Sequence, residues 1–161
     1  MEKLNPIDRL SILIGEKLSI VFLISVVITA YEVFMRYGLN APTIWVHDSA
    51  TALSATGFIM SGTYALQQDR HMRISVVYDI ALPGIRKVLD LINSFLIVFF
   101  MVLLTYTTID QAIPALQVME TSAHAWDVPI PAYLKSIMVV GSAAMLAQAL
   151  VHLWAQIRRF V

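Results

Sequence analysis

Four stretches of the chain are apolar over about the length of a membrane-spanning helix. Such a helix needs about 20 apolar residues to cross the hydrocarbon core, and only helices or closed barrels satisfy all their backbone hydrogen bonds in lipid. The stretches cover about residues 18–35, 49–66, 88–109 and 134–157. The pattern therefore predicts an all-α integral membrane protein, with residues 1–161 forming a single transmembrane domain of four spans.

The connection between the second and third spans is not uniformly polar. An apolar face at i, i+3, i+4 spacing is formed by Ile74, Val77, Tyr78, Ala81 and Leu82. Pro83 and Gly84 then end this segment. We predict a short helix over about 74–82 that lies in the cytoplasmic membrane interface; the alternative is an apolar loop folded against the spans.

Most of the basic residues lie in segments that the four-span pattern places on the same side of the membrane. Of the 11 Lys and Arg residues, only Arg36 and Lys135 fall in the first and third connections. The others lie before the first span, in the second connection or after the fourth span. Because cytoplasmic segments carry the excess of Lys and Arg, both termini are predicted to be cytoplasmic. The first span ends in Tyr31, Glu32 and Val33, which is unlike a signal-peptide cleavage site.

Composition agrees with a membrane protein and excludes several functions. Hydrophobic residues make up 58% of the chain and charged residues 14%, against about 25% charged in soluble domains. The mean hydropathy is +0.73. A net charge of zero gives no field that would favour nucleic acid. The chain has no cysteine, which excludes disulfides, thiolate metal sites and cysteine nucleophiles.

Glu32 and Arg36 are the candidate functional pair of the first span. They lie four residues apart on one helical face, with the acid in the favourable N-terminal position. An ionisable residue at membrane depth is a functional candidate, here for proton coupling. The alternative is an ion pair that holds the depth of the helix or contacts a partner, and we favour it because Glu32 has a cation beside it.

Trp45, His47 and Asp48 precede the second predicted span. Trp45 suits the aromatic belt of a membrane interface. Asp48 or Ser49 is expected to cap the helix by accepting backbone N–H groups. A metal site would need a third ligand such as His124, and nothing in the spacing demands one, so no metal is predicted.

A basic cluster of Arg70, His71 and Arg73 follows the second span. Its cations suit lipid phosphates and leave room for a bound phospholipid. The equally good interpretation is that they only set the topology. No haem is expected, because the histidines lie near the ends of spans or in connections.

Several short motifs, taken in order, resemble one known family. They are FMRYGLN at the end of the first span, Trp45-Val46-His47-Asp48, the small-residue second span, DRHMRISV after it, and VPIPAY before the fourth span. Together they resemble the small, four-helix (Q-type) membrane subunit of tripartite ATP-independent periplasmic (TRAP) transporters over nearly the whole chain. His47 and Ser75 depart from the family, which often has acidic residues at these positions.

The resemblance implies a non-catalytic subunit of the bacterial inner membrane. Its expected partners are a large membrane subunit, which binds sodium and the solute, a periplasmic substrate-binding protein and membrane lipid. No cofactor is expected in this subunit. It would act as a scaffold for uptake of an organic acid or related solute. The alternative is a self-contained proton-coupled exporter that works as a homodimer through Glu32.

Overall fold

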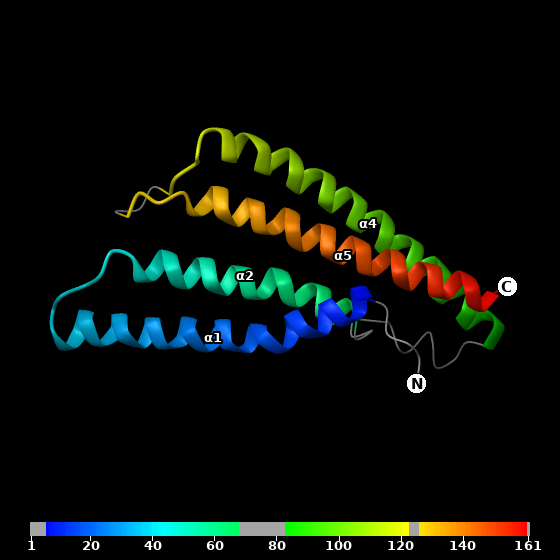
Figure 1. Cartoon of the computed structure of the whole chain (residues 1–161), viewed down its shortest axis with the longest axis horizontal. Coiled ribbons are helices and arrows are strands. Elements are labelled where there is room, and N and C mark those ends of the chain that lie inside the picture. The colour runs from blue at the N-terminus through cyan, green and yellow to red at the C-terminus, as the bar shows by residue number, and fades with distance from the viewer. Residues whose placement is uncertain (1–5, 68–82, 123–125, 161) are drawn as a thin grey trace.

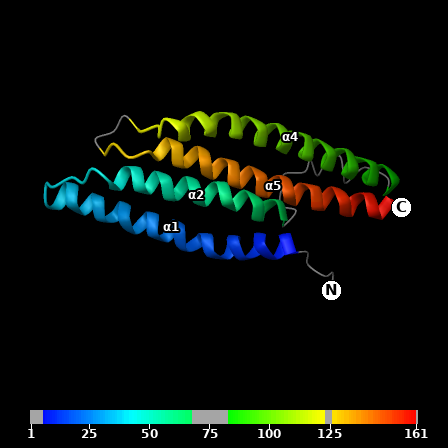
Figure 2. The ribbon, with the colours of Figure 1, turned by 45° about the horizontal axis from the view of Figure 1, so that its top comes forward.

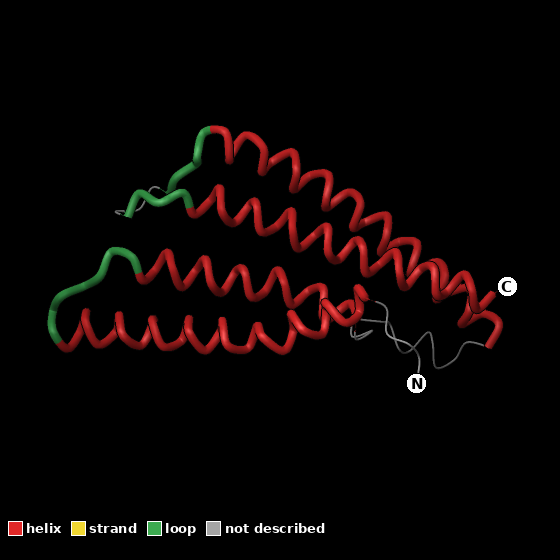
Figure 3. Tube along the Cα trace, viewed as in Figure 1, coloured by secondary structure: helices red, strands yellow, loops and turns green. Residues whose placement is uncertain are grey.

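The regular structure of the described chain is entirely helical. The computed structural model describes residues 6–67, 83–122 and 126–160. Its helices are α1 (Pro6–Gly38), α2 (Val46–Gln67), α4 (Pro83–Gln117) and α5 (Ile130–Phe160). Figure 3 shows the helices in red and the two described connections in green. The predicted interfacial helix at 74–82 lies outside the described residues.

All the described helices are longer than the apolar pattern predicts. Helix α4 contains Pro114 and continues through it to Gln117. A proline removes one backbone N–H and crowds the preceding turn. It is tolerated here because only one turn remains, and the N–H of Val118 still donates to the carbonyl of Pro114 at 3.2 Å.

The four helices form a single layer in the order α1, α2, α5, α4 (Figures 1 and 2). The chain makes two antiparallel hairpins, α1–α2 and α4–α5, and these meet along α2 and α5. In this arrangement α2 and α5 run parallel. Both described connections lie at one end of the layer. The start of α1 and the end of α5 lie toward the other end.

Three of the helices in the described part of the chain are long and apolar enough to cross a membrane. The segments are Lys17–Gly38, Gly84–Gln117 and Ile130–Arg158. Helix α2, which contains the second predicted span, does not reach the same apolarity because of its small and hydroxyl-bearing residues. It lies between α1 and α5, so neighbouring helices cover much of its surface.

Glycines allow the closest approaches in this layer. A Cβ at Gly141 of α5 would overlap the Cγ2 methyl of Ile59 on α2 and lie 3.4 Å from the Ile59 carbonyl oxygen. A Cβ at Gly62 would lie 2.8 Å from the sulfur of Met145. Small residues let helices pack closely in lipid, where van der Waals contact replaces the hydrophobic effect as a driving force.

Each of the three main helix contacts also carries a hydroxyl–hydroxyl hydrogen bond. Ser25 and Ser54 join α1 to α2 at 2.9 Å. Thr56 and Tyr133 join α2 to α5 at 2.9 Å, and Thr108 and Ser142 join α5 to α4 at 3.1 Å. Such bonds contribute on average about 0.6 kcal/mol in a membrane protein. They fix the register of the helices more than they add stability.

The two outer helices carry most of the exposed apolar bulk. Along α4, Phe95, Phe99 and Phe100 are each more than half exposed, and α1 shows a similar run that includes Leu23, Val26 and Val27. A buried cluster of Leu66, Met101 and Ala149 joins α2, α4 and α5. The faces of α1 and α4 therefore suit lipid or another membrane protein.

We predict that Gly141→Ala destabilises the protein, while Gly84→Ala does not. The added methyl at position 141 would overlap the Cγ2 methyl of Ile59. That methyl moves only through χ1, and a helical Ile strongly prefers one χ1 rotamer. Overpacking of this kind costs about 1–3 kcal/mol. A Cβ at Gly84 meets nothing within 4 Å. Thermal unfolding of both variants in detergent measures the difference.

The double variant Gly141→Ala/Ile59→Ala tests whether steric overlap with Ile59 causes the loss of stability. Removing the Ile59 side chain makes room for the new methyl, so the double variant should unfold at a higher temperature than additivity of the single variants predicts. Additive losses would show that the two positions do not meet.

Candidate functional site

Five of the residues singled out in the sequence lie at the α1–α2 corner. They are Glu32, Arg36, Trp45, His47 and Asp48. Glu32 and Arg36 lie in the last two turns of α1, and Trp45 directly precedes α2, while His47 and Asp48 lie in its first turn. The other three candidates, Arg70, His71 and Arg73, lie outside the described residues.

The end of α1 turns the chain back toward Glu32. The N–H of Ala41 donates to the carbonyl of Met35 at 2.9 Å, and Asn40 between them has a φ of 51°. This bond spans six residues, one more than in the common Schellman cap. Asn tolerates the left-handed conformation better than most residues. The cap returns the connection along the last turns of α1 and places Thr43 beside Glu32.

Glu32 accepts hydrogen bonds through both carboxylate oxygens. Its Oε1 accepts from the Nε and Nη2 of Arg36 at 3.0 and 2.6 Å. Its Oε2 accepts from the backbone N–H of Thr43 at 3.1 Å and from the Thr43 hydroxyl. The predicted ion pair is therefore present. Sequence reasoning missed Thr43, because it lies eleven residues away and only the cap brings it close.

The arrangement makes Glu32 a tie between the helix and the connection. Its side chain is 11% exposed, against 51% for Arg36. A buried carboxylate is tolerated when it is paired and hydrogen-bonded, and both conditions hold here. The negative charge of Glu32 is thus compensated by the Arg36 cation and by two neutral donors, the N–H and the hydroxyl of Thr43. Chemically, the cluster holds the connection against α1 and presents one side of the Arg36 guanidinium at the surface.

Exposed aromatic side chains are found at the same corner. The rings of Tyr31 and Trp45 lie 6.3 Å apart between centroids, and Trp45 is 38% exposed. Tyr37 is 81% exposed at the end of α1. Exposed Trp and Tyr residues are typical of the headgroup region of a membrane. The corner therefore has the composition of a membrane interface.

Helix α2 begins three residues earlier than the apolar pattern predicts. Its first residue is Val46, and the N–H of Ser49 donates to the carbonyl of Trp45 at 3.0 Å. Asp48 consequently lies inside the first turn, where the free N–H groups of a helix favour a carboxylate. Asp48 is 4% exposed and Val46 2% exposed, so this helix start is packed inside the corner.

The structure does not group metal-binding side chains at this corner. Within the described ranges, no three His, Cys, Asp or Glu side chains come together in a way that would hold a metal ion. His124, the third ligand that a metal site would have needed, lies outside those ranges.

A second ion pair lies at the α4–α5 connection and was not predicted. Lys135 of α5 donates to Glu120, which follows the end of α4. The end of α4, like that of α1, has a left-handed residue, Met119 with a φ of 47°. The N–H of Glu120 donates to the carbonyl of Ala115 at 2.9 Å, which is the bond of a Schellman cap. The sequence gives no signal for this pair, because its partners come from separate helices.

The chain matches the model of a known protein family. The model of the family described as "Tripartite ATP-independent periplasmic transporters, DctQ component" matches residues 25–159. The matched region includes the α1–α2 corner, α2, α4 and almost all of α5. No curated protein matches the chain.

We predict that Glu32→Gln loosens the connection between α1 and α2. A carboxamide has only one acceptor oxygen, so it cannot accept from Arg36 and from the Thr43 N–H together. Hydrogen exchange of the Thr43 amide should become several-fold faster. In Thr43→Val the backbone N–H keeps its partner, so that amide should change less. Equal protection in wild type and Glu32→Gln would contradict the role given to Glu32.

Proposed function

The chain belongs to the DctQ family, the small membrane component of tripartite ATP-independent periplasmic transporters, and on this premise we propose that it is a non-catalytic scaffold. It would hold the large transport subunit in place while that subunit moves the solute. The observation that carries the proposal is the family match, which covers most of the chain.

Family membership implies a large membrane subunit and a periplasmic binding protein as partners. We propose that the binding protein delivers an organic acid or related solute, and that the large subunit couples its uptake to sodium. The small subunit would then need no cofactor, metal or catalytic residue of its own. It would form a heterodimer with the large subunit in the bacterial inner membrane.

We propose that all four described helices cross this membrane, with both termini in the cytoplasm. Helix α2 has 22 residues, which at about 1.5 Å per residue is long enough for a core about 30 Å thick. Its neighbours shield its small and polar side chains from lipid. The excess of Lys and Arg ahead of the apolar part of α1, from residue 70 to the first turns of α4, and in the last turn of α5 supports the orientation.

The contacts of Glu32 support a scaffold better than a self-contained exporter. A carboxylate that carries protons must gain and lose them during transport, and its surroundings must accept both states. Glu32 instead accepts four hydrogen bonds, two from Arg36 and two from Thr43. Protonation would remove acceptor capacity from a cluster that depends on it. Its position near the connection end of α1 also suits anchoring.

The apolar faces of α1 and α4 are the proposed contact surfaces for the large subunit, with lipid covering what remains. The exposed side of Arg36 and the aromatic pair at the corner would set the depth of the helices. The full set of residues proposed for anchoring, partner contact or lipid contact is Glu32, Arg36, Trp45, His47, Asp48, Arg70, His71 and Arg73.

We predict that the chain transports solute only together with its large subunit. Co-expression of both, with a tag on this chain alone, should yield a one-to-one complex by mass measurement. Liposomes containing the complex and the binding protein should take up solute along a sodium gradient, while liposomes with this chain alone should match empty ones. Transport by a homodimer of this chain alone would overturn the scaffold function.

The variants Glu32→Gln and Arg36→Ala distinguish between an anchoring role and a proton-coupling role for the corner. If the corner anchors the subunit, both variants should lower the yield of complex, and the complex that does form should transport at the wild-type rate. A normal yield of complex with transport abolished only by Glu32→Gln would instead assign a proton-coupling role to Glu32.

A further inference from the structure

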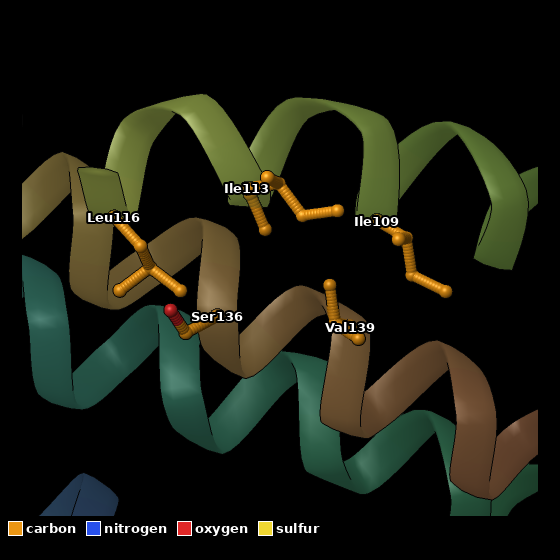
Figure 4. Close-up of a pocket in the computed structure, with 6 residues that line it drawn as sticks. Ile109, Ile113, Leu116, Ser136 and Val139 are labelled. Carbon is orange, nitrogen blue, oxygen red and sulfur yellow. The ribbon is translucent and has the colours of Figure 1, made fainter. Parts of the chain in front are cut away.

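A groove lies between α4 and α5 near their connected ends. It has a volume of about 200 Å³ and is lined by Ile109, Ala112, Ile113, Leu116, Ser136 and Val139. Figure 4 shows the side chains of Ile109, Ile113 and Leu116 on α4 and those of Ser136 and Val139 on α5, around the space between the two helices. Both walls belong to segments apolar enough to cross a membrane.

The lining suits hydrocarbon. Ile113 is 52% exposed and Leu116 49% exposed, while Ala112 is 4% exposed and forms the floor. The one hydroxyl in the lining, that of Ser136, donates to the carbonyl of Ala132 at 2.8 Å. Its proton is therefore already used within α5. From Ile109 to Leu116 the helix rises about 10 Å, which is long enough to hold part of an extended acyl chain.

An ion pair lies next to one end of the groove. Lys135 directly precedes Ser136, and Glu120 follows Leu116 by four residues. The two side chains form an ion pair, in which the Lys135 side chain is 31% exposed and that of Glu120 42% exposed. The helix cap at Met119 holds Glu120 in this position. A negative and a positive group are therefore presented together at the connection end of an apolar groove.

We propose that the groove and this ion pair form a binding site for a zwitterionic glycerophospholipid. One acyl chain would lie in the groove, with the phosphate beside Lys135 and the amine beside Glu120. Any lipid chain can fill an apolar surface in a bilayer, so the groove alone would not select among lipids. The ion pair would select among lipid headgroups. A zwitterionic headgroup places an opposite charge beside each member of the pair, whereas a purely anionic headgroup has no cation for Glu120 and is repelled by its carboxylate.

The test measures which lipid the full-length chain retains. The protein is placed in lipid discs of equal parts phosphatidylethanolamine and phosphatidylglycerol, and the lipid still bound after gentle release is identified by native mass spectrometry. We expect phosphatidylethanolamine to be enriched about fivefold, the factor that one charge contact near a membrane surface supplies. Equal retention of the two lipids would overturn the proposal.

Two pairs of variants locate the site. Glu120→Gln/Lys135→Gln should abolish the enrichment, while the charge swap Glu120→Lys/Lys135→Glu keeps an opposite pair and should preserve it. Ile113→Trp fills the groove and should lower total lipid retention. Ile92→Trp, at a site 50% exposed on α4 outside the groove lining, should not. Enrichment that survives the neutral double variant would place headgroup selection elsewhere.

The last comparison is between the lipid retained by this chain alone and the lipid retained by its complex with the large subunit. If a lipid occupies the groove, the enriched species should remain bound when the large subunit is present. Its complete displacement would show that the groove receives a side chain of that subunit, and the lipid proposal would be wrong.

Discussion

The layer depends on close contact between α2 and α5, because this contact joins the two hairpins. It is formed where Gly141 meets Ile59 and Gly62 meets Met145, with the Thr56–Tyr133 hydrogen bond toward the connection end. In lipid, no hydrophobic effect drives two apolar helices together, so the fit of the surfaces must supply the attraction. The small residues that lower the apolarity of α2 are therefore the ones that let it pack between α1 and α5.

The two connections that the structure describes have two features in common. Each begins with a helix cap that has a left-handed residue, Asn40 or Met119, and each holds one ion pair. In the pairs, Arg36 binds Glu32 and Lys135 binds Glu120. These are the two cations that the charge pattern places away from the basic side.

These features are consistent with a static subunit. The Glu32 tie, the caps and the hydroxyl bonds each hold one element against its neighbour, and they leave the apolar faces of α1 and α4 open for lipid or the large subunit. A membrane protein that carries its own transport site tends to place ionisable groups or broken helices near the middle of the bilayer. Here Glu32 lies near the end of its helix, and its carboxylate binds the connection through Thr43.

The sequence by itself determined the helical class, the approximate positions of the helices, the uneven distribution of charge and the Glu32–Arg36 pair. Each of these depends on residues that are close in the chain, through helical periodicity or a spacing of four. The ends of helices were predicted less well, because caps and the tolerated Pro114 depend on single backbone bonds. Only the tertiary structure decided that α2 and α5 are neighbours, that Thr43 completes the tie at Glu32, and that Glu120 meets Lys135. These contacts join residues from different helices or across a turn, and local pattern carries no information about which surfaces meet.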